Sequence, residues 1–378
     1  MPGLKVTVSN TLAIVGTNFA QHKLELTNSE SVIACGDLRV RGATLSLGAP
    51  DRPFYYPNDN YWDERHQIVE GPTLTCSGDL VLTNAGLAGA RLLVHAGLAH
   101  AGTDPEYGAQ VTVGGDILTY SNCWIHPVAH PTNGTVPLFS MNNLKISRYG
   151  GFDANAWGFA SGRVSGQETN IWNRPYGPGI STNTSVNHAS ANAGSSYGGM
   201  GTRGYYGYPA PVYGSAEAPI LPGSGARSGW ASGGSAGPWG GGSVQIRADN
   251  AVELTGTIRA DGGNGAITYG PPASGGAIYI RCLTFAGNTN GMLSANGGDA
   301  APSGATIPFD GGGAGGGRIA VWRMNDLSTG AVAVTVNGGL GGHFTTNLTG
   351  QWGSFATGDP GTIVWGQLPV AGTVIRFR

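Results

Sequence analysis

The chain has 378 residues, a formal net charge of −2, 67 glycines and 11% charged residues, and 40% of its residues are apolar. This apolar content and the low charge differ from the polar, highly charged composition of disordered chains, so we expect the chain to fold. The sequence has no block of like charge, so it gives no reason to expect nucleic acid as a partner. No run of 18 or more apolar residues occurs, so the sequence predicts no membrane insertion.

The first residues, Met1-Pro2-Gly3-Leu4, lead straight into a strand-like pattern without the apolar core of a signal peptide. Low charge with abundant Gly, Asn, Thr and Tyr is typical of extracellular β-solenoids. We therefore expect an extracellular or cell-surface protein from which a leader has been removed, with a cytoplasmic protein as the alternative.

Residues 1–148 contain short runs in which apolar and polar residues alternate, as in strands with one buried face. A Gly-Asp-Leu or Gly-Asp-Ile phrase recurs at Gly36, Gly78 and Gly115. Aspartate after glycine fits a corner, where the carboxylate accepts backbone N–H groups. We interpret this part as N-terminal coils, with structural roles for Asp37, Asp79 and Asp116.

Three segments between these strands, residues 51–70, 100–107 and 123–132, are predicted to be loops because they gather ionisable and aromatic residues. Insertions in solenoid proteins map to one face of the repeat array. If the three loops leave the same corner of successive coils, they lie side by side and form one wall.

Residues 149–240 are predicted to form a long insertion, rich in Gly, Ser, Asn and aromatic residues and poor in strand-like runs. A structureless segment of that length inside a compact domain is either functional or disordered, and the many aromatic rings argue against disorder. We expect the insertion to lie along the side of the coils with its rings packed on the sheet.

Residues 241–378 contain regular repeats. One glycine-rich phrase occurs as Gly241-Gly242-Ser243-Val244-Gln245-Ile246-Arg247, Gly275-Gly276-Ala277-Ile278-Tyr279-Ile280-Arg281 and Gly316-Gly317-Arg318-Ile319-Ala320-Val321-Trp322. A second phrase follows each copy and centres on Asp261, Asn296 and Asn337. Self-similarity with a period of 20 to 50 residues predicts a solenoid, in which each unit buries its apolar face against the next.

These phrases predict strands, because their apolar residues alternate with period two and the flanking glycines supply corners but disfavour a helix by about 1 kcal/mol each. One coil would contain two strands, the second at residues 252–254, 292–294 and 332–334. Stacked coils would place Val244, Ile278 and Ile319 next to one another in a parallel sheet. The predicted fold is all-β, a right-handed parallel β-helix (β-solenoid) that forms a single domain over residues 1–378.

The four cysteines, Cys35, Cys76, Cys123 and Cys282, lack the CxxC spacing of zinc-binding and thioredoxin-type motifs. Cys35 and Cys76 each stand just before a Gly-Asp-Leu phrase, which predicts similar positions on stacked coils. We favour a ladder of buried thiols, with a disulfide as the alternative.

Residues 205–342 resemble the glycine-rich parallel β-helix modules of large bacterial secreted and surface proteins. The resemblance rests on the order of Tyr213-Gly214, Gly223-Ser224-Gly225 and the repeated phrases of residues 241–342. More loosely, the predicted architecture is similar to that of pectate-lyase-like β-helix enzymes and phage tailspikes, which act on polysaccharides. By analogy of fold, this similarity implies a secreted protein that binds or degrades an extracellular polysaccharide.

Hydrolysis of a polysaccharide needs two carboxylates facing each other across the sugar, whereas a lyase needs a base near a uronate and a cation that neutralises the uronate carboxylate. The predicted loops supply candidates for both reactions. The candidate catalytic residues are Asp63, Glu64, Arg65, His66, His100, Asp104, Glu106 and His126. The aromatic candidates for stacking on sugar rings are Tyr61, Trp62, Tyr107, Trp124 and Trp157.

Two histidine pairs, His95 with His100 and His126 with His130, have ligand-like spacing. Pro127, however, argues against a helix that presents the second pair on one face. The glycine-rich segments also lack the aspartate of the calcium-binding nonapeptide repeat. We expect no metal and no cofactor.

The alternative functional class is structural, namely an adhesive surface protein or a filament-forming β-solenoid. A solenoid with open ends can associate end to end, and an uncharged aromatic flank can associate sideways. Two carboxylates, or a base and an arginine, that converge on one groove would favour the enzyme, whereas loops that point apart would favour assembly.

Overall fold

The computed structural model describes residues 4–26, 31–48, 71–98, 107–161, 175–183, 193–204, 207–227, 237–265, 270–301, 311–328, 330–342 and 356–369. All regular secondary structure in these ranges is β-strand, and the strands of the two main sheets run parallel. Within the same ranges, no helix has the length and apolar character needed to cross a membrane.

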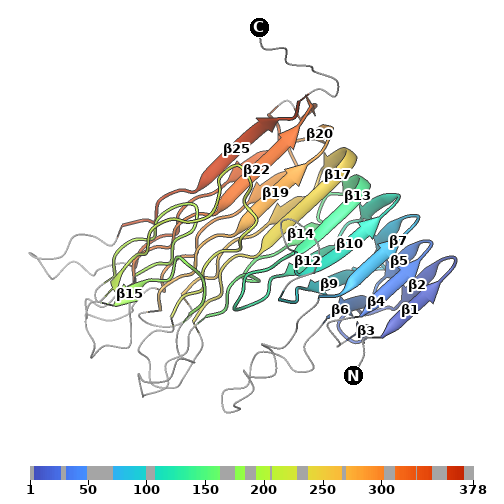
Figure 1. Ribbon diagram of the computed structural model, residues 1–378, viewed down its shortest axis with the longest axis horizontal. Coiled ribbons are helices and arrows are strands. Elements are labelled where there is room, and N and C mark those ends of the chain that lie inside the picture. Colours follow the sequence, from blue (N-terminus) through green and yellow to red (C-terminus); the bar gives the residue numbers. More distant parts are fainter. Residues whose placement is uncertain are drawn as a thin grey trace, which may run out of the picture.

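The chain passes repeatedly through three strand positions, which we call the first, second and third rows (Figure 1). The first row consists of β1 (Lys5–Val8), β4 (Val32–Cys35), β7 (Thr73–Cys76), β10 (Ala109–Val113), β19 (Ala277–Arg281), β22 (Arg318–Arg323) and β25 (Thr362–Gln367). The second row consists of β2 (Leu12–Val15), β5 (Leu38–Arg41), β8 (Leu80–Thr83), β11 (Asp116–Thr119), β20 (Thr284–Gly287) and β23 (Asn325–Asp326).

Two longer strands, β13 (Pro137–Ile146) and β17 (Ser243–Leu254), run through both of these rows and join them into one 15-stranded sheet, sheet A. The third row is the separate 8-stranded sheet B. Its members are β3 (Lys23–Leu26), β6 (Thr44–Leu47), β9 (Arg91–His95), β12 (Trp124–Val128), β14 (Gly151–Asp153), β18 (Thr257–Arg259), β21 (Met292–Ser294) and β24 (Ala333–Thr335).

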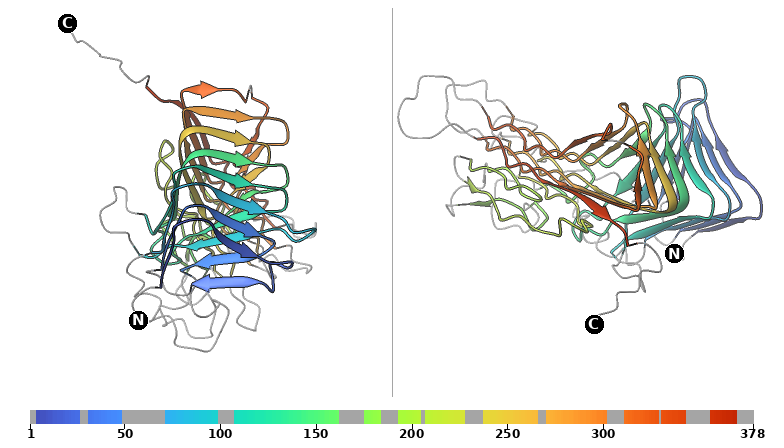
Figure 2. Two further views of the ribbon diagram at one scale, coloured as in Figure 1. Left: turned by 90° about the vertical axis from the view of Figure 1, so that its right-hand side faces the viewer. Right: turned by 90° about the horizontal axis from the view of Figure 1, so that it is seen from above.

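Each strand pairs in parallel with its counterpart in the next pass, so successive passes lie on one another in a β-helix-like arrangement (Figure 2). Val244 is in register with Ile278, and Ile278 with Ile319, as the repeated phrase predicts. The prediction of two strands per coil is wrong, because a pass contains three. Residues 252–254 belong to the second row, and the third-row strand of that pass is β18, whose polar sequence Thr-Ile-Arg hid it.

The core lies between the rows and is built from inward-facing residues that repeat from pass to pass. The side chains of Val244, Ile278 and Ile319 are each 0% exposed. They belong to one continuous cluster of Leu, Ile, Val, Ala, Cys, Met and Phe that extends over all three rows. Because every pass contributes the same kinds of apolar residue, the core grows by repetition and needs no single centre.

Side-chain ladders hold the corners between rows. The backbone N–H of Asp79 donates to Asp37 Oδ1 at 3.0 Å, and the N–H of Asp116 donates to Asp79 Oδ1 at 2.8 Å. The prediction that corner carboxylates accept backbone N–H groups is therefore confirmed for Asp37 and Asp79, whereas Asp116 Oδ1 accepts the side-chain amide of Asn143 at 2.7 Å. The carboxylates of Asp37 and Asp79 bond the backbone of the following pass, which ties neighbouring passes together at a point where the strand ladder is interrupted.

A second ladder links Asn155, Asp261, Asn296 and Asn337. Each of the first three offers its side-chain Oδ1 to the backbone N–H of the next, at 2.7, 2.7 and 2.8 Å. This ladder lies just after the third row, where the chain turns back towards the first. The Asp/Asn-Gly-Gly phrase of the sequence is thus a corner with a fixed side-chain acceptor.

The long connections share one place in the pass, because each joins a third-row strand to the next first-row strand. They are residues 48–72 between β6 and β7, 96–108 between β9 and β10, and 154–242 between β14 and β17, the last of which includes the antiparallel pair β15 (Thr182–Asn183) and β16 (Gly207–Tyr208). The segments predicted to be loops at residues 51–70 and 100–107 lie outside the described residues, apart from Tyr107. Gly151–Asp153, within the predicted insertion, is instead a strand of sheet B.

In the later passes, glycine-rich segments follow the third-row strands and precede the first-row strands, and they run side by side without strand pairing (Figure 2). In residues 273–276 the four successive N–H groups donate to the carbonyls of Gly263, Ser224, Gly315 and Ala260. The first and fourth donors therefore bond the same neighbouring segment, and residues 314 and 317 likewise both bond segment 295–298. A three-residue period is that of an extended polyproline II-type conformation, whereas a strand would give a period of two.

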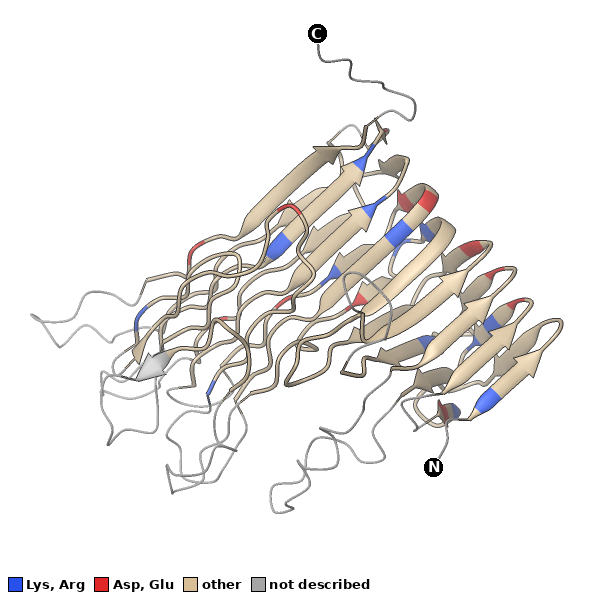
Figure 3. Ribbon diagram, viewed as in Figure 1, with Lys and Arg blue, Asp and Glu red and all other residues tan. Residues whose placement is uncertain are grey.

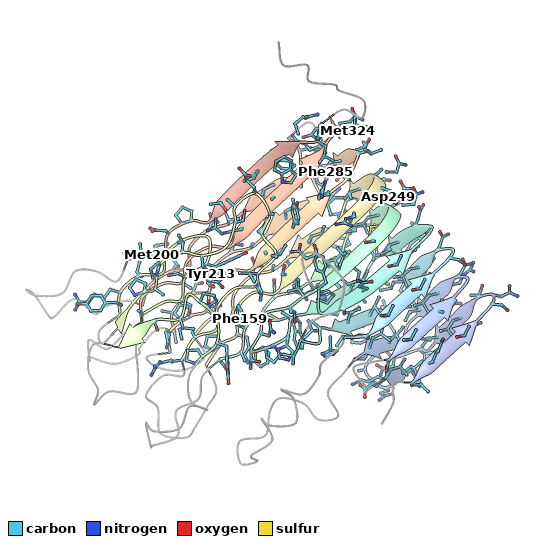
Figure 4. All side chains as sticks on the ribbon, viewed as in Figure 1. Phe159, Met200, Tyr213, Asp249, Phe285 and Met324 are labelled. Atoms are coloured by element: carbon cyan, nitrogen blue, oxygen red, sulfur yellow. The ribbon has the colours of Figure 1, made fainter. Side chains whose placement is uncertain are left out.

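Part of the predicted insertion covers the outer face of sheet A. The Arg318 guanidinium donates to Tyr213 O at 2.8 and 3.0 Å, Gln245 Nε2 donates to Pro219 O, and Trp322 Nε1 donates to Glu217 O. Tyr213, labelled in Figure 4, packs on the fully buried ring of Tyr197 with centroids 4.7 Å apart. For these described residues, the prediction that the insertion packs along the sheet is confirmed.

Candidate functional site

Ionisable and aromatic side chains gather on the outward face of sheet B. Strands β9, β12, β14 and β18 alternate between buried and half-buried residues, so every second side chain points away from the core. The outward residues of interest are Arg91 on β9, Trp124 and His126 on β12, Asp153 on β14 and Arg259 on β18. We call these five residues the sheet B patch. Charges elsewhere lie mainly along the strands and their corners, and few lie in the glycine-rich segments (Figure 3).

An ion pair orders the centre of the patch. Arg259 Nη2 donates to Asp153 Oδ2 at 2.9 Å, and the two residues face each other in register across β14 and β18. The same guanidinium lies over the Trp124 ring, 4.9 Å from its centroid. Because a guanidinium is planar and weakly hydrated, it stacks on an indole while keeping its hydrogen bonds. The ion pair therefore fixes the position of the tryptophan ring as well.

The imidazole of His126 is held in one tautomer. Its Nδ1 lies 3.0 Å from the backbone carbonyl oxygen of Asp153, and a carbonyl only accepts, so Nδ1 carries the proton. Burial lowers the pKa of His126, although the negative charge of Asp153 opposes the effect. At neutral pH the ring is therefore neutral. Its Nε2 keeps a lone pair with no hydrogen-bond partner among the described residues.

Arg91 adds positive charge at the edge of the patch. Its Nη1 donates to the carbonyl oxygens of Asn122 at 2.6 Å and Ala90 at 3.0 Å, and the guanidinium lies 4.3 Å from the centroid of the Phe19 ring. Within the described ranges it makes no ion pair. With Arg259 balanced by Asp153 and a neutral His126, the patch has a net charge of about +1.

His95, the last residue of β9, is a further titratable group beside the patch. Burial, with a smaller contribution from the nearby His126, lowers the pKa of His95 to about 4. Its imidazole is therefore neutral at neutral pH. The neighbouring histidines can be close together without repulsion as long as both remain unprotonated.

The structure places the predicted site residues in different surroundings. His126 and Trp124 come together in the sheet B patch. Trp157 is half-buried in the turn that follows β14, where its carbonyl oxygen accepts the N–H of Ala129. Tyr107 is only 5% exposed and packs with Ala129 and Val136, so little of its ring is accessible to a sugar. The other candidates lie outside the described residues: Tyr61, Trp62, Asp63, Glu64, Arg65, His66, His100, Asp104 and Glu106.

The prediction of a loop at residues 123–132 is wrong, because Trp124–Val128 is strand β12. Pro127 obscured the strand, since proline removes a ladder donor and is rare inside sheets. Here the pairing of β12 with β14 is confined to Trp124 and Ile125, so Pro127 lies beyond it. His130 sits in the following turn, where its Nδ1 accepts the N–H of Asn133 at 3.1 Å. Over the described ranges, no three His, Cys, Asp or Glu side chains are grouped to hold a metal.

Sequence reasoning missed Arg91, Asp153 and Arg259. A signal was present for Arg91 alone, since it directly precedes the apolar run Leu92-Leu93-Val94, whereas β18 has a single apolar residue beside Arg259. The missing information was the register, because residues 91, 124, 153 and 259 become neighbours only when the four strands are aligned. No known protein family, curated protein or solved structure matches this chain.

Proposed function

We propose that the protein is a secreted right-handed parallel β-helix whose sheet B patch binds an acidic extracellular polysaccharide. The right-handed winding is supported by the general rule that crossovers between parallel strands of one sheet are nearly always right-handed. The binding function is supported mainly by one observation, the Trp124 indole fixed by the Arg259 and Asp153 ion pair on an outward sheet face.

The patch offers the two interactions that a uronate polymer needs. An indole face presents a flat apolar platform on which the C–H face of a sugar ring packs. A guanidinium forms charge-assisted hydrogen bonds with a carboxylate, and Arg91 has no carboxylate partner within the described part of the chain. A long polymer would lie across several passes, because equivalent outward positions repeat along sheet B.

Binding is tested by calorimetry with polygalacturonate, alginate and a neutral glucan, using the wild type, Trp124→Ala and Arg91→Gln. The wild type should bind the uronate polymers, and binding should weaken as salt screens the charges. Trp124→Ala should weaken binding at least tenfold, about 1.4 kcal/mol, because the stacking platform is lost. Arg91→Gln should weaken binding of the uronate polymers alone.

Tyr208→Ala is the matched control, because Tyr208 is an exposed aromatic residue on β16 and stacks on Arg203 instead. Its affinity should equal that of the wild type. Absence of binding by the wild type, or equal binding by Trp124→Ala, would reject the proposal. Ordered filaments in the absence of any glycan binding would favour the structural alternative.

The fixed tautomer of His126 favours a second activity, polysaccharide cleavage by β-elimination. In this reaction the Nε2 lone pair removes the proton at C5 of a uronate, the C4–O bond breaks, and the departing oxygen takes up a proton as the C4=C5 double bond forms. The same samples are therefore assayed for the ultraviolet absorbance of the unsaturated product. His126→Ala should abolish that product while leaving polymer binding within twofold of the wild type.

A further inference from the structure

Two of the four cysteines lie directly opposite each other in neighbouring passes. Cys35 ends β4 and Cys76 ends β7, and the two residues are partners in the parallel register. Their Sγ atoms are 3.4 Å apart. Both side chains point into the core, with 7% and 1% of their surface exposed. All four cysteines of the protein are free thiols in this structure.

The backbone geometry at this pair suits a covalent link. Neighbouring strands in a sheet are about 4.8 Å apart, which falls within the Cα separations that disulfides span. The sulfur atoms need to approach by about 1.4 Å to reach bonding distance, a movement within the range of a side-chain rotation. No strand has to shift its register.

The other two cysteines have different surroundings. Cys123 Sγ accepts the N–H of Ala90 at 3.4 Å, which fixes it in the corner before β12. Cys282 follows β19, and its own N–H donates to Trp322 O. Neither is paired with a cysteine in the strand register, so they serve as internal controls.

We propose that Cys35 and Cys76 form a reversible disulfide that joins two successive passes of the N-terminal part of the stack. The oxidant is a small-molecule disulfide such as oxidised glutathione. One cysteine thiolate attacks the oxidant and releases one glutathione thiolate, which leaves a mixed disulfide. The second cysteine thiolate then attacks the protein-bound sulfur and releases the second glutathione. The two protons lost by the cysteines are taken up by the two glutathione thiolates.

The bond closes a loop that consists of residues 36–75 and contains β5 and β6. A disulfide that closes a loop of this length stabilises a protein chiefly by restricting the unfolded chain. The cross-link also opposes local opening of the passes that it joins, which is otherwise the easiest motion near one end of a stack.

Burial raises the pKa of both thiols, so the reactive thiolate is scarce once the chain has folded. Oxidation should therefore be carried out during refolding of the full chain in a glutathione redox buffer. Free thiols are then blocked, and peptides are mapped by mass spectrometry without reduction. The expected result is one cross-linked peptide pair that contains Cys35 and Cys76, with Cys123 and Cys282 blocked.

The register supplies a conservative control variant. Val8 and Val113 occupy the same row immediately before Cys35 and immediately after Cys76, so valine fits this part of the core. Oxidation should raise the Tm of the wild type by about 5 °C, and should leave the Tm of Cys76→Val unchanged. Cys282→Ala should retain the oxidative shift. Four blocked thiols after refolding in the oxidising buffer, or a cross-link that involves Cys123 or Cys282, would overturn the proposal.

Discussion

At the scale of single residues, the corners of the stack impose backbone conformations that not every side chain tolerates. Asn122, Tyr149 and Ala156 have φ angles of 60°, 64° and 52°, in the left-handed region. Asparagine tolerates this region, whereas tyrosine and alanine are strained there by about 1–2 kcal/mol. Tyr149 and Ala156 follow the second and third rows, respectively, of one pass, so that pass has a strained corner on either side of β14.

Ala156 offers a direct test of this strain. Its N–H donates to Asp261 O at 3.0 Å, so the backbone conformation is fixed by a hydrogen bond between passes. Ala156→Gly should raise the free energy of unfolding by about 0.5–1 kcal/mol, because relief of strain exceeds the extra entropy of glycine in the unfolded chain. Urea denaturation measures the change. Ala13→Gly on the exposed side of β2 should instead lower stability, and a loss of stability in both variants would contradict the strained corner.

Residue types predicted the role of the corner aspartates but not their partners. Aspartate after glycine indicated a carboxylate bonded to backbone N–H groups, and Asp37 and Asp79 do accept such bonds. The donors lie 42 and 37 residues further along the chain. Only the register of stacked passes determines those partners, and alternation within a single strand contains no information about register.

At the scale of elements, the ladder of Asn155, Asp261, Asn296 and Asn337 links four successive passes at the corner that follows the third row. Asp261 is the only charged member, and it accepts the N–H of Asn296 at 2.7 Å and the hydroxyl of Ser294 at 3.0 Å. The carboxylate therefore ties its own pass to the next one by two bonds. The asparagines at equivalent positions indicate that the amide oxygen alone suffices for the backbone bond.

We therefore predict different effects for two substitutions at position 261. Asp261→Asn should change the free energy of unfolding by less than about 0.5 kcal/mol, because the acceptor is retained and the Ser294 hydroxyl can rotate to accept from the amide. Asp261→Ala should cost about 1–3 kcal/mol, because the N–H of Asn296 loses its partner in a half-buried corner. Guanidinium denaturation of the two variants compares them directly. If both variants are as stable as the wild type, the hydrogen bond at position 261 is dispensable for stability.

The strands of the repeated phrase were predictable because β-branched residues alternate there between glycine corners. The third-row strands β12 and β18 were not, since one contains Pro127 and the other has only one apolar residue, Ile258. Both are held by their neighbours in sheet B. The candidate site was accordingly predicted in part. The chemistry of Trp124 and His126 identified these two residues in the sequence. Arg91, Asp153 and Arg259 join them only through the stacking of the strands.

At the scale of the whole molecule, two kinds of backbone packing are combined. Within each of the three rows, parallel strands pair around an apolar core. The glycine-rich segments pack beside the rows, and their successive backbone N–H groups donate to carbonyls of several different neighbouring segments. In that second region, the stabilising contacts are between backbones, because little side chain is present. This packing explains how a chain with a high glycine content can still fold. Composition alone does not decide whether such a chain is ordered or disordered.

Gly276 tests how closely these segments must approach. A Cβ at this position would lie 1.9 Å from Gly242 O and 2.5 Å from Gly241 C, both backbone atoms of the preceding pass. Its N–H also donates to Ala260 O at 2.7 Å, so the segment cannot move aside without losing that bond. Gly276→Ala should lower the free energy of unfolding by about 3 kcal/mol.

Gly330→Ala is the matched control, because no atom of the described residues lies within 4 Å of a Cβ there and its φ of 73° is unfavourable for alanine. It should cost about 1–2 kcal/mol from backbone strain alone. Both variants are compared with the wild type by chemical denaturation and by yield of soluble protein. If alanine at position 276 costs no more than at position 330, the glycine-rich segments have room between them. Their glycines would then serve chain flexibility, and close packing would no longer account for the composition of this part of the molecule.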